Sequence, residues 1–366
     1  MYILLLLLLF YSVLILRLMI ALFVKKSNTG EPKTPHPVSI VIPFRNEQKH
    51  LKTLLQSLQH QSYSGQYEIL LINDGSTDQS VKIINEFKKH SAIDLTVLDS
   101  PYDSGCELTS KQQALNFGID RARHDWIALT DADMKLLPEW LNSLMINSGQ
   151  NTDMVFGHTA LITDNRAFTR IQAFQLEFLF SAAYTFNKAG IAGSCMGNNM
   201  LVSKQAYQKA GGQKAVGYNM VEDRALMNLF RQKEMNISCT DPFLPLALTF
   251  PCESWNHFFH QFKRWARGGF VWHSNLLFIG LLFSLQNVLL FLSCFSILPK
   301  TLTIVTIGNF LLTWLFTTLS FRKIRSSQNF FYFPFFLLFL LFETILFLLS
   351  FFSKSDIEWK GRKLNR

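Results

Sequence analysis

The chain has 366 residues, of which 49% are hydrophobic and 35 are phenylalanine, and its formal net charge is +9. The apolar residues are concentrated at the two ends, which excludes an ordinary soluble protein, and the length allows about two domains. The positive charge suggests nucleic acid or an anionic membrane as partner. Basic residues stand beside apolar runs and no nucleic-acid-binding module is recognisable, so we expect a membrane and no nucleic acid.

The N-terminal segment 1–24 is almost entirely Leu, Ile, Phe and Val, and its length suits a membrane-spanning helix. Lys25 and Lys26 follow it, whereas a signal peptide carries its charge before the apolar run and a cleavage site after it. We therefore expect a retained anchor. Lys and Arg mark the cytoplasmic side, and the five cysteines form no Cys-x-x-Cys pair. Both observations favour a cytoplasmic domain at 34–272.

Short apolar runs alternate with amphipathic stretches in the first part of this domain. The runs that predict strands lie at 38–43, 67–72, 95–98 and 126–130, and the spacing of apolar residues predicts helices between them, the last over 108–122. This alternation predicts an α/β fold with a mainly parallel sheet and helices on both faces.

Acidic residues follow three of the predicted strands. Glu47 comes after the first strand, Asp74 after the second, and Asp131 and Asp133 after the fourth. Open α/β sheets bind ligands beyond the carboxyl ends of their strands, so we expect these acids to converge on one cleft. Asp131 and Asp133 repel each other unless a cation lies between them, which indicates Mg²⁺ or Mn²⁺ bound with substrate phosphates. Asp is also common in turns, and on this stretch alone the two interpretations are equal.

Two more side chains have both a functional and an ordinary explanation. Asp74 suits a nucleobase because a carboxylate accepts a hydrogen bond from a ring N–H such as uracil N3–H, although Asn-Asp-Gly alone favours turn chemistry. Lys111, in the last predicted helix, could face a diphosphate, although a lone helix lysine is more often solvated. The absence of a GxGxxG motif and of a P-loop argues against a dinucleotide enzyme and a P-loop ATPase.

Several motifs, in this order and at these separations, resemble the membrane-bound glycosyltransferases of family two with the GT-A fold. They are Ile42-Pro43-Phe44-Arg45-Asn46-Glu47, Asn73-Asp74-Gly75-Ser76-Thr77-Asp78, Asp131-Ala132-Asp133, Gly197-Asn198-Asn199, Val221-Glu222-Asp223 and the QxxRW signature Gln261–Trp265. The resemblance covers about 38 to 270. The most similar subgroup includes ceramide glucosyltransferases and bacterial lipid or carotenoid glycosyltransferases, and Trp359-Lys360-Gly361-Arg362 is similar to the tail of some of these.

The resemblance implies a nucleotide-sugar site at the strand ends and a catalytic set further along the chain. It implies that Asp74 holds the base, that Asp131 approaches the ribose and sugar, and that Asp133 holds the metal. The implied donor-binding residues are Pro43, Glu47, Asp74, Lys111, Asp131 and Asp133. The implied catalytic residues are the general base Asp223 and, closing over the diphosphate and sugar, Gln261, Arg264 and Trp265.

The chemistry of inverting sugar transfer supports three of these roles independently. One carboxylate takes the acceptor proton, and a metal and a cation stabilise the departing diphosphate. That requires a metal-bound acid, a free acid and an arginine, which Asp133, Asp223 and Arg264 supply. Asp223 could instead be an acid favoured at a helix N-terminus, and Arg264 could be an interfacial charge beside the membrane.

The C-terminal region 275–352 contains three more apolar segments, at 275–298, 301–320 and 330–352, and the basic tail 353–366 follows. Three full crossings would place that tail outside, against the positive-inside rule. We expect one segment to be re-entrant or interfacial, and 330–352 is the candidate because Glu343 in mid-membrane is costly. A further apolar run, 168–186, is too polar to span, so we expect an interfacial or acceptor-side helix or a buried core helix.

We therefore expect a hexosyltransferase that moves a sugar, with inversion, from a UDP-sugar to a lipid or lipid-linked acceptor. It would be a multi-pass cell-membrane protein with a cytoplasmic catalytic domain and a divalent metal. One alternative is a processive polysaccharide synthase, which the small number of membrane segments disfavours. An alternative of another class is an inactive membrane scaffold or a transporter, in which the acids would be dispensable.

Overall fold

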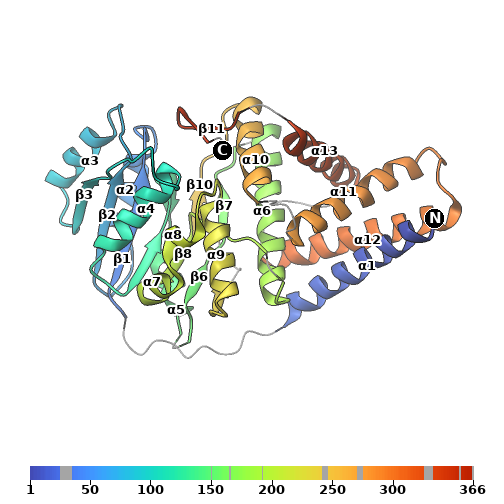
Figure 1. The fold of residues 1–366 in the computed structure, drawn as a ribbon, viewed down its shortest axis with the longest axis horizontal. Helices are drawn as coiled ribbons and strands as arrows, with labels where there is room; N and C mark the ends of the chain where they lie inside the picture. Colours follow the sequence, from blue (N-terminus) through green and yellow to red (C-terminus); the bar gives the residue numbers. More distant parts are fainter. Residues whose placement is uncertain are drawn as a thin grey trace.

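The structure is a computed structural model that describes residues 1–24, 35–149, 151–164, 166–191, 193–240, 246–269, 275–324, 333–353 and 356–364. Figure 1 shows a part built on a β-sheet at one end and a bundle of long helices at the other. Two helices, α6 (Ala167–Lys188) and α10 (Trp255–Gly269), lie between these parts.

The main sheet has seven strands in the order β3-β2-β1-β4-β8-β6-β9. The first four strands are parallel to one another, and β8 is antiparallel to both of its neighbours. This confirms the predicted α/β fold with a mainly parallel sheet. The strand bounds are β1 Val38–Phe44, β2 Tyr67–Asn73, β3 Leu95–Asp99, β4 Trp126–Leu129, β6 Met154–Phe156, β8 Met200–Ser203 and β9 Ile237–Cys239.

Helices cover both faces of this sheet because successive strand residues point to opposite sides. Ile40 and Ile42 belong to the core that includes α2 (Leu51–Gln59) and α3 (Ser80–Lys89). The opposite face packs against α4 (Ser110–Arg121), where a Cβ on Gly118 would lie 2.6 Å from Val41 Cγ1. The close approach of α4 fixes the position of its N-terminus over the strand ends.

Smaller elements complete the sheet-containing part and the tail. A second sheet has the order β5-β10-β7, and a two-stranded hairpin, β11–β12, follows the last helix. The bounds are β5 Met134–Leu136, α5 Trp140–Ile146, β7 Thr159–Leu161, α7 Lys204–Ala210, α8 Gly212–Val216, α9 Glu222–Gln232, β10 Ala247–Thr249, β11 Glu358–Trp359 and β12 Arg362–Lys363.

Within the described residues, three helices are long and apolar enough to cross a membrane: α1 (Tyr2–Phe23), α11 (Asn275–Ser293) and α12 (Lys300–Lys323). In α13 (Phe333–Phe352) the apolar helix is the shorter segment Leu338–Ser350. Polar pairs join the long helices, as where Tyr11 Oη lies 2.8 Å from Thr313 Oγ1. Such pairs fix helix packing in an apolar environment because a buried polar group without a partner is costly.

The sheet and the long helices share one continuous apolar core. It contains Val41 of β1, Leu14 of α1, Phe180 of α6 and Phe316 of α12. The helix α6, expected from the sequence to be interfacial or buried, therefore packs on both sides. It also donates a hydrogen bond from Gln175 Nε2 to Glu343 Oε1 of α13, at 2.7 Å. The sheet-containing part and the apolar helices are thus held in a fixed relation.

Candidate active site

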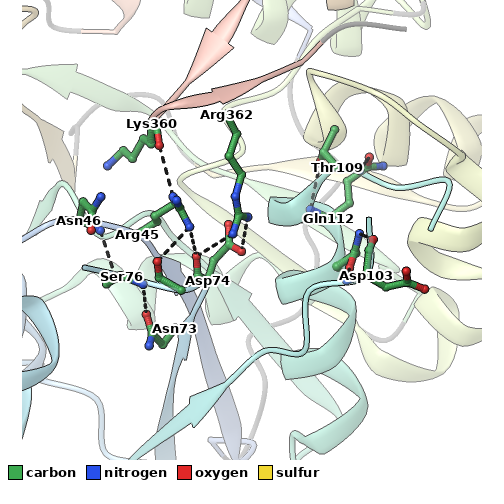
Figure 2. A network of polar contacts seen from close by, with 12 residues as sticks. Arg45, Asn46, Asn73, Asp74, Ser76, Asp103, Thr109, Gln112, Lys360 and Arg362 are labelled. Atoms are coloured by element: carbon green, nitrogen blue, oxygen red, sulfur yellow. Dashed lines mark hydrogen bonds and ion pairs between the residues drawn. The ribbon is translucent and has the colours of Figure 1, made fainter. Parts of the chain in front are cut away.

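The sheet brings the predicted acids to one edge because β1, β2 and β4 are parallel. Glu47 and Asp74 are both buried there, at 8% and 2% exposure. The loops after β1 and β2 hold each other: the Asn46 amide donates to Ser76 Oγ at 3.1 Å, and the Ser76 amide donates to Asn73 Oδ1 at 2.9 Å (Figure 2). The two loops therefore form one rigid rim.

Asp74, the predicted base-binding residue, is contacted by two arginines. Arg362 Nη1 lies 2.6 Å from Asp74 Oδ1, and Arg45 Nη1 donates to the Asp74 carbonyl oxygen at 2.6 Å (Figure 2). The second carboxylate oxygen, Oδ2, is buried and has no hydrogen-bond partner among the described residues. Arg362 also lies over the ring of Tyr102, 4.2 Å from its centroid. Asp74 thus keeps one acceptor atom available to a ligand.

Glu47 and Asp133 form the next part of the edge. Lys360 makes an ion pair with Glu47. Burial raises the pKa of Glu47 to about 7, Lys360 opposes that rise, and the charges of Asp133 and Asp131 add to it. The pKa of Asp133 is raised by burial and then by Asp131, and no ion pair joins Asp133 to the described residues. The carboxylate of Asp133 is therefore destabilised by its surroundings and lacks a direct counter-charge.

Lys111 neutralises the inner part of the site. Its Nζ lies 2.8 Å from Asp131 Oδ1 and 2.8 Å from Glu222 Oε1. Burial by itself would lower the pKa of Lys111 and raise that of Asp131. The ion pairs outweigh burial, so the pKa of Lys111 is raised and that of Asp131 is lowered. A capping box between Thr109 and Gln112 fixes the start of α4 beside Lys111 (Figure 2). The ordinary interpretation of Lys111 as a solvated lysine is therefore wrong.

Asp223, the predicted base, stands at the start of α9. Its Oδ1 accepts a hydrogen bond from the Arg224 amide at 2.7 Å. A Cβ on Gly197 would lie 2.3 Å from Asp223 Oδ2, so the Gly-Asn-Asn loop approaches as only glycine permits. Burial, and then the charge of Glu222, raise the pKa of Asp223 to about 6. A carboxyl group with that pKa can hold and release a proton near neutral pH.

Two adjoining pockets connect these groups. The first is lined by Lys111, Asp131, Glu222 and Asp223 among others. The second shares Lys111 and Glu222 with the first and adds Arg264 of the QxxRW signature. Residues from α4, β4, α9 and α10 therefore line two adjoining pockets, whereas Glu47, Asp74 and Asp133 lie outside the lining of both.

The other predicted residues, Pro43, Gln261 and Trp265, do not line either pocket. Pro43 is buried within β1, opposite Ile72 of β2. Gln261 accepts a hydrogen bond from Cys252 Sγ at 3.4 Å, and the Cys252 amide donates to Gln172 of α6 at 2.8 Å. Trp265 is half-buried on α10. The signature helix is thus connected to α6 through Cys252.

Several residues at the edge have contacts that no sequence pattern predicted. Glu222 was recognised only as part of a motif, and its ion pair with Lys111 depends on a contact between α4 and α9. Arg45, Tyr102, Lys360 and Arg362 surround Asp74 and Glu47. The one signal for the last two was the similarity of the tail motif to other tails.

The described residues contain no cluster of three or more His, Cys, Asp or Glu side chains able to hold a metal ion. Asp133 offers hard oxygen ligands and forms no ion pair with the described residues. A divalent ion there would take its remaining ligands from a substrate, as Mg²⁺ commonly does at diphosphates.

Comparisons with known proteins agree with this architecture. The family model described as glycosyl transferase family 21 matches residues 2–365. A probable glycosyltransferase, YdaM, of Bacillus subtilis (strain 168) is 26% identical over 244 residues, which are 63% of this chain and 54% of the relative. The 4,4'-diaponeurosporenoate glycosyltransferase of Staphylococcus aureus (strain USA300) is 23% identical over 222 residues, 56% of this chain and 54% of the relative.

The chain spans about half the length of these curated relatives. Among solved structures, the mannosyltransferase PcManGT from Pyrobaculum calidifontis, in complex with GDP-Man and Mn²⁺, has a TM-score of 0.58. It is 11% identical in sequence, and the superposition covers 94% of this chain and 95% of that one. At this identity the likeness establishes the fold.

Proposed function

This chain belongs to glycosyl transferase family 21, and we propose that it transfers a sugar, with inversion, from a UDP-sugar to a lipid or lipid-linked acceptor at the membrane. The family makes it a glycosyltransferase of the GT-A fold, as its motifs predicted. The observation that carries the proposal is the run of acids from Asp74 to Asp223 along one edge of the sheet, with Lys111 and Arg264 acting on Asp131 within it.

The nucleobase would bind at Asp74. The buried Oδ2 atom of Asp74 has no partner in the described residues, and leaving a buried acceptor unpaired costs about 1–3 kcal/mol. A ring N–H of uracil would satisfy that acceptor. Arg45 fixes the carbonyl oxygens of Asp74 and Gly75, at 2.6 and 2.9 Å, so the carboxylate is already oriented.

The site fits a divalent metal because Asp133 combines hard oxygen atoms with an electrostatic environment that disfavours its bare charge. Asp133 would hold the ion, and the diphosphate would complete its shell. A bound Mg²⁺ or Mn²⁺ neutralises negative charge that develops on the diphosphate as the sugar departs.

The protein's own residues would perform the transfer. Asp223 accepts the proton of the acceptor hydroxyl, and the hydroxyl oxygen bonds to the anomeric carbon of the sugar. The bond from that carbon to the diphosphate oxygen breaks and UDP leaves. Attack opposite the leaving group inverts the anomeric centre. Lys111 and Arg264 supply positive charge toward the leaving diphosphate.

The position of the site supports a membrane-dissolved acceptor. The helices α6 and α10 separate the sheet from α1, α11 and α12 (Figure 1), and α10 carries the QxxRW signature. We infer that both lie at the cytoplasmic interface and that α13 does not cross the membrane. The contacts of Lys360 and Arg362 with Glu47 and Asp74 support this topology, because they require the tail on the catalytic side.

The test is donor hydrolysis and transfer by the purified full chain in lipid nanodiscs made with a membrane lipid extract. We expect release of UDP from a UDP-sugar with Mn²⁺ or Mg²⁺ present, loss of release with EDTA, and a new glycolipid in the mass spectrum. A set of GDP-sugars serves as the matched donor control. Transfer from GDP-sugars alone would refute the donor assignment, and a glycosylated protein or free sugar polymer would refute the lipid acceptor.

A further inference from the structure

The C-terminal hairpin occupies the mouth of the donor site, although 280 or more residues separate it from the loops that it contacts. Lys360 pairs with Glu47, and Arg362 pairs with Asp74. The Lys360 carbonyl oxygen also accepts a hydrogen bond from Arg45 at 3.3 Å (Figure 2). Three cations therefore surround the two acids where the nucleoside half of a donor would bind.

The hairpin is a formed structural element. Its turn residues Lys360 and Gly361 both have positive φ, 47° and 77°, which is the geometry of a tight two-residue hairpin. The Leu364 amide donates to the Ile357 carbonyl oxygen at 2.7 Å, and both side chains are buried. Leu364 also lines the pocket that contains Lys111 and Arg264. The hairpin thus forms one wall of the cleft and points its cations inward.

The charges of this wall suit a diphosphate better than the carboxylates that they now contact. A guanidinium group binds phosphate oxygens in pairs, and a diphosphate offers more negative charge than one carboxylate. The side chains of Arg362 and Lys360 are 20% and 27% exposed, whereas those of Asp74 and Glu47 are 3% and 10% exposed, so the two cations reach the buried acids from the more open side of the cleft. The stacking of Arg362 on Tyr102 leaves the guanidinium supported during an exchange of partners.

We propose that Lys360 and Arg362 are donor-binding residues that occupy Glu47 and Asp74 in the nucleotide-free protein and move to the diphosphate when the donor binds. In the free protein these cations lie beside the place where the nucleoside would enter. With a donor bound, they close over the diphosphate. The inference rests on the proposed nucleotide donor, and it assigns a donor contact to the last described residues of the chain.

This exchange predicts opposite effects on two ligands. A nucleoside without phosphates has to enter beside the Arg362 guanidinium, which contacts Asp74 Oδ1, and it offers this cation no phosphate to bind. Removing the Arg362 charge should therefore leave uridine binding unchanged or a few-fold tighter. UDP receives the released cation, so the same change should weaken UDP binding by about tenfold, which corresponds to about 1.4 kcal/mol.

The experiment measures UDP affinity by titration calorimetry, and uridine by competition against UDP, for the full chain in nanodiscs. The variants are Arg362→Gln and Lys360→Gln, with Arg362→Lys to restore the charge. The matched control is Lys363→Gln, whose side chain is on the same hairpin, is 67% exposed and pairs with Asp356 at 2.9 Å. We expect the first two variants to lose about tenfold in UDP affinity, Arg362→Lys to recover part of it because it restores the charge without the paired hydrogen bonds, and the control to change less than twofold.

Each alternative result is informative. If UDP binding and uridine binding are weakened equally, the hairpin is a fixed structural wall. If UDP binding is unchanged, the cations of the hairpin do not contact the donor. Either result overturns the inference. Unfolding temperatures of the variants separate these results from misfolding, and Lys360→Gln tests the exchange if Arg362→Gln does not fold. If the unaltered protein binds neither UDP nor GDP, the proposed function itself fails.

Discussion

Two groups of ion pairs neutralise acids at the edge of the sheet, and the two groups are built differently. The inner group is Lys111 with Asp131 and Glu222, in which one lysine lies 2.8 Å from each of two carboxylates. The outer group is the hairpin pair, Lys360 and Arg362, in which each cation has its own acid. The inner cation comes from a helix packed on the sheet, and the outer cations come from the tail.

The difference teaches which part of the site is fixed and which can respond to a ligand. The side chain of Lys111 is 15% exposed, and its helix begins at a capping box against Thr109. The charge of Lys111 is therefore a permanent feature of the inner part of the site. The hairpin cations are more exposed and are held by a short element at the end of the chain. Their charges can change partners without unfolding the domain.

The largest expected effect lies at the inner end. Asp223→Asn removes the proposed base while keeping the shape of the side chain. We expect the transfer rate to fall by about 10²- to 10⁴-fold, the range typical of a general base. The measurement is UDP release with saturating donor and lipid acceptor, and the control is Asp120→Asn on the exposed end of α4. A transfer rate within twofold of the unaltered protein would exclude Asp223 as the base and remove the chemical role of the inner end.

Lys111→Met tests whether the inner cation is structural as well as electrostatic. The change leaves Asp131 and Glu222 without their shared counter-charge, and breaking a buried ion pair from one side costs about 3–5 kcal/mol. We expect a decrease of about 3 kcal/mol in the free energy of unfolding, measured by equilibrium denaturation in mild detergent. Lys360→Gln is the matched outer variant and should cost less, because the pKa of Glu47 is raised by burial to about 7 and this carboxyl can take up a proton when its counter-charge is removed. Equal losses in the two variants would contradict the distinction between a fixed and an exchangeable group.

The fold and much of the edge could be predicted from the sequence because both depend on local patterns. Apolar runs of strand length predicted the four strands β1 to β4. Because β1, β2 and β4 are parallel, the loops that follow them bring Glu47, Asp74 and Asp131 to one edge of the sheet. The pairing of charges could not be predicted in this way. No local pattern indicated that Asp131 pairs with Lys111 while Asp133 forms no ion pair in the described part of the chain. That asymmetry depends on how closely α4 packs on the sheet.

The contacts of the C-terminal tail are even less predictable from local sequence patterns. Lys360 and Arg362 lie at the end of a basic segment, and such segments beside apolar helices are ordinarily explained by membrane topology. No periodic pattern connects them to Glu47 and Asp74, more than 280 residues earlier. Only the path of α10 and α13 brings the hairpin back to the sheet. A contact of this kind depends on the whole arrangement of helices, which local sequence patterns do not encode.

The smallest predicted effect separates the electrostatic role of the inner group from its structural one. Asp223 must be ionised to act as a base, and burial and the charge of Glu222 raise its pKa to about 6. The rate should therefore be constant above about pH 7 and should fall about tenfold for each pH unit below 6. Glu222→Gln removes a negative charge and leaves more of the Lys111 charge to act on Asp223. Both effects of this substitution lower the pKa of Asp223.

The acid limb of the Glu222→Gln profile should accordingly shift by about one unit toward lower pH. The measurement is kcat/KM from pH 4.5 to 8, normalised to the plateau of each protein so that an overall loss of activity does not affect it. Glu86→Gln on the exposed face of α3 is the control and should leave the limb in place. An unshifted limb would mean that Glu222 does not act on the base through its charge. A shift toward higher pH would mean that the loss of Glu222 buries Asp223 more deeply, so the inner group would be structural alone.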